Sequence, residues 1–138
     1  MDERNGYFHH DDPEHEPQRE ISRVQRIHLE LIRLASFNDF HGDQVAHDLE
    51  TYPQLWKAAM MGNFGHGGEL LVLRDMERGL NNVDTLMVLT TEEHAPAMEE
   101  MAWTWRADEV GWLPEEEAGE ALGLSPVGDL RLLRCWWG

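Results

Sequence analysis

Lysine, cysteine and long apolar runs are scarce in this sequence of 138 residues. Lys57 is the only lysine, and Cys135 is the only cysteine, so an intrachain disulfide is excluded. No apolar run approaches the roughly 20 residues that span a bilayer. The first residues also lack the basic and apolar regions of a signal peptide. We therefore expect a cytoplasmic protein without a membrane partner.

Positive charge is scarce as well, because 27 acidic residues face 11 basic ones and the net charge is −16. This balance argues against direct binding of nucleic acid, since cationic side chains drive contacts to phosphates. The charge is unevenly spread. Residues 92–122 hold ten acidic residues against one arginine, whereas residues 17–35 carry a net charge of +2. The negative charge is therefore concentrated in one segment of the sequence rather than distributed evenly along it.

Residues 1–16 are rich in His, Asp and Glu and predict a disordered tail, followed by a single domain over residues 17–138. A helix is predicted over residues 18–36 from apolar residues at helical spacing. We expect that stripe to be the buried face of the helix. Its members are Ile21, Val24, Ile27, His28, Leu31, Ile32, Leu34 and Ala35.

The remaining pattern predicts an α+β fold with the order α-α-β-β-α-α-β. It consists of a second helical stretch over residues 43–62, which Pro53 either kinks or divides into two abutting helices, followed by strands and two further helices. The strands are at 70–73, 83–89 and 130–137, and the further helices begin near Pro96 and Pro114. We expect a small three-stranded mixed sheet with the helices packed on one face. The helical crossover between the last two strands favours parallel pairing.

The acidic segment carries the first functional hypothesis. Its carboxylates alternate with tryptophans, which are frequent anchors at protein interfaces. We predict a small acidic module that docks on a basic partner, for example an inhibitor, an immunity-type protein or a DNA mimic that binds a nuclease or another nucleic-acid-binding protein. A solvated face that promotes solubility is the simpler interpretation. The candidate partner-binding residues are Glu99, Glu100, Trp103, Asp108, Glu109, Trp112, Glu115 and Glu116.

A metal-dependent enzyme or metal-regulated domain is the alternative. His41, Asp43 and His47 are close in the sequence, and imidazole with carboxylate suits a divalent metal ion. Their spacing matches no established metal motif. Cys135 lies in an apolar run, which is typical of an inert packing residue. The sequence therefore predicts a binding protein rather than an enzyme, with no required cofactor.

A homo-oligomeric structural protein is the third interpretation. In this hypothesis, the arginine-rich segment at residues 17–35 pairs with the acidic segment of a neighbouring copy.

Overall fold

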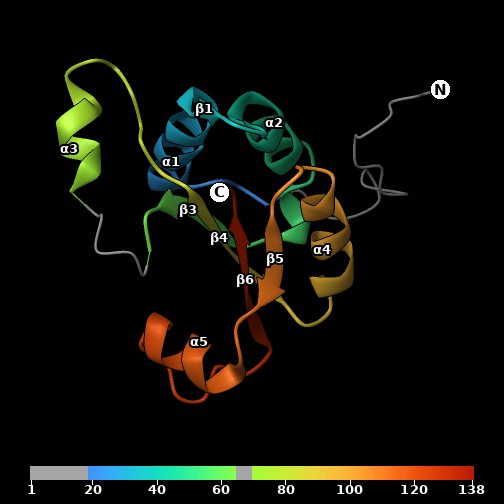
Figure 1. The fold of residues 1–138 in the computed structure, drawn as a ribbon. Coiled ribbons are helices and arrows are strands. Elements are labelled where there is room, and N and C mark those ends of the chain that lie inside the picture. Colours follow the sequence, from blue (N-terminus) through green and yellow to red (C-terminus); the bar gives the residue numbers. More distant parts are fainter. Residues whose placement is uncertain (1–18, 65–69) are drawn as a thin grey trace.

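The computed structural model describes residues 19–64 and 70–138, and the predicted tail lies outside these ranges. The architecture mixes helices and strands (Figure 1). The helices are α1 (Arg23–Leu34), α2 (Gly42–Thr51), the one-turn η2 (Pro53–Leu55), α3 (Leu71–Met76), α4 (Ala95–Trp103) and α5 (Glu115–Leu122). The strands are β1 (Ser36–Phe37), β2 (Phe40–His41), β3 (Ala58–Gly62), β4 (Thr85–Thr91), β5 (Glu109–Trp112) and β6 (Leu130–Trp136).

The strands form two antiparallel sheets, so the prediction of one three-stranded mixed sheet is wrong. A short hairpin joins β1 and β2, and the main sheet has four strands in the order β3-β4-β6-β5. β4 and β5 both run antiparallel to β6, and are therefore parallel to each other. The α4 crossover does connect parallel strands, but they are β4 and β5. β6 inserts between them.

Two local predictions are wrong for the same reason. The predicted second helix ends at Thr51, and the sequence after η2 forms β3, with Ala59 and Met61 buried and Met60 exposed between them. The predicted strand at residues 70–73 falls instead in α3. Helical spacing and strand alternation overlap in short apolar segments, so packing against the sheet decides between them.

The segments with strong local signals form as predicted. α4 and α5 begin at or next to Pro96 and Pro114, and α5 ends at Gly123, which adopts a left-handed conformation with φ of 70°. β4 and β6 match the predicted strands to within two residues. Prolines at helix starts and glycine at a helix end act through local backbone sterics, which explains why these elements are predictable.

The buried face of α1 matches the predicted one only in part, since Ile32 and the following Ala35 are buried as expected. Gln25, Leu29 and Ile32 are buried, whereas Val24 and Leu34 are more than 60 % exposed. The buried glutamine is satisfied because its side-chain amide donates to the Ala59 carbonyl oxygen at 2.8 Å and accepts from the Ala59 N–H at 2.9 Å. Gln25 thus takes the place of a further strand at the edge formed by β3.

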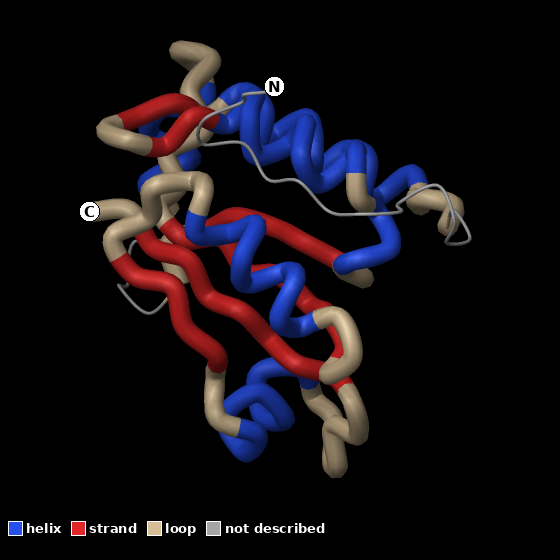
Figure 2. The backbone as a smooth tube through the Cα atoms, turned by 90° about the vertical axis from the view of Figure 1, so that its right-hand side faces the viewer, coloured by secondary structure: helices blue, strands red, loops and turns tan. Residues whose placement is uncertain are grey.

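The main hydrophobic core lies on one face of the sheet, under α1, α2 and α4. Figure 2 shows α4 lying along this face, with α5 near the lower end of the sheet. α5 belongs to a smaller cluster in which its Ala118 packs with Leu132. Leu132 and Leu133 are adjacent on β6 and belong to the two different clusters, so α5 packs on the opposite face from α4. The prediction that all helices share one face is therefore only partly right.

None of the helices within the described ranges has the length and apolarity that a bilayer-spanning helix requires.

Candidate functional site

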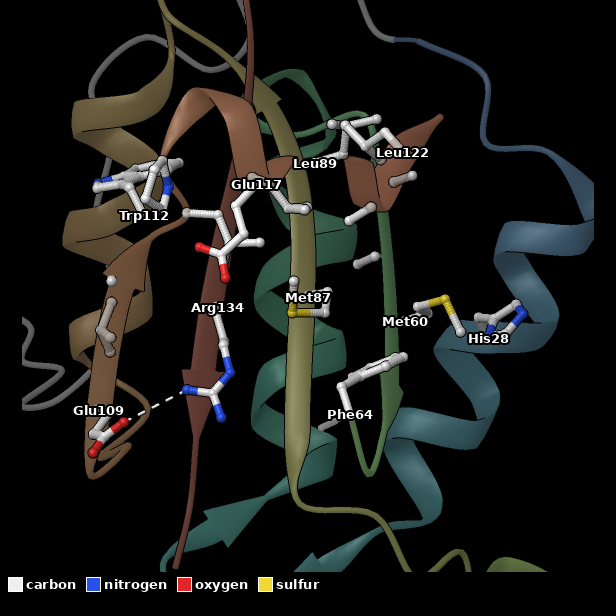
Figure 3. Close-up of a pocket in the computed structure, with 18 of the residues that line it drawn as sticks. His28, Met60, Phe64, Met87, Leu89, Glu109, Trp112, Glu117, Leu122 and Arg134 are labelled. Carbon is white, nitrogen blue, oxygen red and sulfur yellow. Dashed lines mark hydrogen bonds and ion pairs between the residues drawn. The ribbon is translucent and has the colours of Figure 1, made fainter. Parts of the chain in front are cut away.

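The face of the sheet opposite the main core forms a broad groove with a volume of about 1200 Å³. α5 closes one end of it, and α1 borders the β3 side (Figure 3). Met60, Met87 and Arg134 lie side by side across its floor, because register pairs Met60 with Met87 and Met87 with Arg134. Leu89 and Leu132 pair in the next row on the same face. The lining residues are Gln25, His28, Ala58, Ala59, Met60, Phe64, Met87, Leu89, Trp103, Glu109, Val110, Gly111, Trp112, Leu113, Pro114, Glu117, Ala121, Leu122, Leu132 and Arg134.

Arg134 is the charged residue at the centre of this apolar floor. Its neighbour in register on β5 is Gly111, and a Cβ added to this glycine would meet no atom within 4 Å. The guanidinium group is therefore open toward the groove on that side. Its Nη1 pairs with Glu109 Oε1 at 3.5 Å, a separation at which the ion pair is weak (Figure 3). The pair leaves the centre of the floor close to neutral.

One end of the groove is organised by the carboxylate of Glu99. It accepts a hydrogen bond from Trp112 Nε1 at 2.7 Å and a second from Trp103 Nε1 at 3.2 Å. Both tryptophans line the groove, and Trp103 is 51 % exposed. Glu99 therefore fixes two large aromatic side chains at the groove margin. Its own oxygens are engaged rather than free for a partner.

The other predicted partner-binding acids occupy different settings. Asp108 accepts from the Gly138 N–H at 2.6 Å, and Glu115 lies 3.9 Å from Arg131. Glu100 and Glu116 are exposed, and within the described ranges neither forms an ion pair. The structure thus places Trp103, Glu109 and Trp112 in the lining of one groove, with Glu99 hydrogen-bonded to the two tryptophans, and places the remaining acids elsewhere.

The acidic segment does not form one continuous surface. Glu100 is on α4, which covers the main core, whereas Glu116 is on α5 at the opposite face of the sheet. Of the four exposed carboxylates on α5, three form no ion pair within the described ranges: Glu117, which lines the groove, and its neighbours Glu116 and Glu120. The unpaired negative charge beside the groove therefore comes mainly from α5.

The three predicted metal ligands are not assembled into a site. His41 precedes α2, and Asp43 and His47 are exposed on that helix. Asp43 accepts a hydrogen bond from the Gln44 N–H, and the His47 ring lies 3.5 Å from the Thr51 hydroxyl. In residues 19–64 and 70–138, no three His, Cys, Asp or Glu side chains are grouped so as to hold a metal ion.

Two buried reactive groups are packing residues. Cys135 lies in the main core, where burial raises the pKa of its thiol to about 12, so the nucleophilic thiolate is suppressed. Asp48 is 3 % exposed and accepts a hydrogen bond from Trp105 Nε1 at 2.9 Å. Burial raises the pKa of this carboxyl group. It connects α2 to the chain after α4 and does not line the groove.

The floor of the groove was not anticipated from the sequence, although a signal exists. Along β4, Leu86 and Val88 pack in the main core while Met87 and Leu89 point to the other face. Alternate residues of a strand point to opposite faces of the sheet, so a strand that is apolar at both odd and even positions predicts a sheet with two apolar faces. The sequence does not indicate that Arg134 belongs to the groove, because its position on the floor depends on pairing between strands that are distant in the sequence.

Comparisons with known proteins give no assignment: no protein-family model, no curated protein and no solved structure matches this chain.

Proposed function

We propose that this chain is a protein-binding module and that the groove receives a basic amphipathic helix of its partner. The observation that carries the proposal is the apolar floor bordered by unpaired carboxylates on α5. An amphipathic helix offers the matching combination, with apolar side chains on one face and cationic side chains beside them.

The dimensions of the groove suit a helix. Four strands spaced by about 4.8 Å give a floor about 14 Å wide, and a helix with its side chains is about 10–12 Å across. The volume of about 1200 Å³ exceeds the roughly 300–1000 Å³ that is typical of small-molecule pockets. The methionines on the floor, Met60 and Met87, are flexible and adapt to partner side chains of varied shape.

The charge also favours a basic partner. The net charge of −16 steers cationic surfaces toward the chain over a long range. At short range, Glu117 on α5 lines the groove, and Glu116 and Glu120 are exposed neighbours on the same helix. Trp103 and Trp112 supply aromatic anchors at the end near α4. Nucleases and other nucleic-acid-binding proteins carry basic surfaces of this kind, so the chain would act as an inhibitor, an immunity-type protein or a DNA mimic.

Two synthetic peptides of about 18 residues test the proposal, each with leucines on one helical face. One carries lysines on the other face and the second carries glutamates. We expect the lysine peptide to bind and to change the fluorescence of the groove tryptophans, with an affinity that falls as salt screens the charges. The glutamate peptide should not bind.

Variants separate the groove from general electrostatics. Glu116→Lys and Glu117→Lys should each weaken binding by roughly twofold to thirtyfold, whereas Glu77→Lys, at the residue that follows α3, is the matched control. Met60→Glu should weaken binding although it adds negative charge, because it interrupts the apolar floor. Absence of binding to the lysine peptide, or tighter binding by Met60→Glu, would contradict the proposal.

A further inference from the structure

Exposed apolar side chains concentrate in two segments outside the groove. Of the twelve large apolar side chains that are exposed in the described ranges, nine lie within residues 24–34 and 70–80. Asn81 ties these segments together, because its side-chain amide donates to the Leu31 carbonyl oxygen at 3.2 Å. We refer to the exposed apolar side chains of these two segments as the α1–α3 ridge. In Figure 1, α3 lies at the margin of the molecule, away from the sheet.

The α1 part of the ridge has the spacing of a helix-packing seam. Val24, Ile27, Leu31 and Leu34 follow one another at steps of three, four and three residues and are between 40 % and 68 % exposed. This is the a/d pattern by which helices pair with other helices. The core-facing side of α1 is separate, since it is formed by other residues. α1 therefore has one face for its own core and a second apolar face without a partner in the described chain.

The area of the ridge matches the requirement of a dimer. The nine side chains are 40–72 % exposed, equivalent to about five fully exposed side chains, or on the order of 500 Å² at roughly 100 Å² each. A stable interface hides about 800 Å² per partner, of which about two-thirds is apolar in homodimers. The ridge therefore supplies about the apolar area that one copy contributes to such an interface.

Charge favours a second copy over another partner. Residues 19–35 carry a net charge of +2 and residues 70–82 are neutral, in a chain with a net charge of −16. Several charged groups beside the ridge form ion pairs, as in Arg33 with Glu50 at 2.6 Å and Arg74 with Asp75 at 2.9 Å. Such a surface attracts neither strongly acidic nor strongly basic proteins. It is also the side on which two copies approach with the least repulsion.

We infer that the α1–α3 ridge is a homodimer interface in which two copies of this chain pack the exposed apolar side chains of α1 and of residues 70–80 together about a two-fold axis. Apolar burial drives this association, and repulsion between two acidic bodies opposes it. Salt screens the repulsion, so the dimer should strengthen as salt increases. The dependence has the opposite sign to that proposed for a basic partner in the groove, so each proposal can fail without the other.

Sedimentation equilibrium of the full chain at low and high salt tests the inference. We expect a species of twice the 16.0 kDa chain mass whose dissociation constant falls between 50 mM and 500 mM NaCl, concentrations at which the Debye length shortens from about 14 Å to about 4 Å. A chain that stays monomeric across this range at concentrations up to about 1 mM overturns the inference. So does a dimer that dissociates as salt rises.

Ridge variants identify the interface. Ile27→Glu and Leu34→Glu change side chains that are 53 % and 67 % exposed, so the fold, monitored by circular dichroism, should be retained. Each should weaken the dimer by roughly a hundredfold or more, because the two-fold axis places every change in the interface twice. Leu124→Glu, at a 42 % exposed position outside the ridge, is the matched control and should leave the dimer intact. A dimer that survives both ridge variants overturns the inference, and binding of the lysine peptide should be unchanged in all three variants.

Discussion

Gln25→Met tests whether the buried amide holds α1 against the edge of the sheet. The two side chains have similar length and volume, so the substitution removes the hydrogen bonds with little change in packing. In the native chain, the Gln25 amide pairs with both the N–H and the carbonyl group of Ala59, at 2.9 and 2.8 Å. Methionine would leave these two backbone groups buried and unpaired.

The expected loss follows from the number of groups left unpaired. A buried donor or acceptor without a partner costs about 1–3 kcal/mol, so the free energy of unfolding should fall by about 2–6 kcal/mol. Unfolding entropy scales with chain length, and for 138 residues about 1 kcal/mol corresponds to a shift of about 3 °C in Tm. Thermal and urea unfolding at one fixed protein concentration should therefore show a Tm about 6–18 °C lower.

Gln54→Met is the matched control for the same chemical change. Both amide atoms of Gln54 are buried, and in the described part of the chain neither has a hydrogen-bond partner. Removing an unpaired polar group costs nothing in hydrogen bonding, so this variant should be as stable as the native chain or more stable. Equal losses in the two variants would refute the reasoning, because the effect would then come from packing alone.

Four further predictions concern other parts of the chain. Gly42→Ala should lower the free energy of unfolding by about 3 kcal/mol or more, because the added Cβ would overlap two backbone carbonyl oxygens at the end of α1, whereas Gly111→Ala, into open space, should have little effect in the same urea titration. Hydrogen bonding by the adjacent arginine lowers the pKa of Asp75 to about 2, so its ionised form contributes stability above about pH 4 that is lost as the pH falls toward 2. The acid branch of the stability curve should therefore flatten in Asp75→Asn, and an unchanged branch would contradict this. Burial raises the pKa of Asp48, so its ionisation lowers stability as the pH rises above about 4. Asp48→Asn should consequently gain relative stability between pH 4 and pH 7 in denaturant titrations, and a growing deficit would count against it. The thiol of Cys135 should react with a disulfide reagent only at the rate of unfolding, and rapid labelling of the native chain would contradict its burial.

Some elements were predictable because their signals are local. Prolines next to the starts of α4 and α5, and Gly123 at the end of α5, act on the backbone within one helical turn. β4 and β6 are apolar enough to be recognised as strands from composition alone. The exposure of Trp103 also follows from its helical angle relative to the apolar residues of α4.

β3 and β5 required the tertiary structure. β3 continues an apolar spacing that is also compatible with the preceding helix, and Gly111 within β5 resembles a turn in the sequence. Each becomes a strand because a neighbouring strand supplies its hydrogen-bond partners. Without β5, the chain appeared to have one parallel strand pair, and the groove with Arg134 on its floor could not be anticipated.

The sequence by itself determined that the chain is acidic, that its negative charge is concentrated in residues 92–122, and that α1 is amphipathic. Only the tertiary structure decided which side of α1 is buried. Composition favours burial of Val24 and Leu34 together with Ile32, yet Val24 and Leu34 are exposed and Gln25 faces the core beside Ile32. The physical reason is that the edge of β3 presents backbone groups that must be paired, and an amide in the right place satisfies them where an apolar side chain cannot.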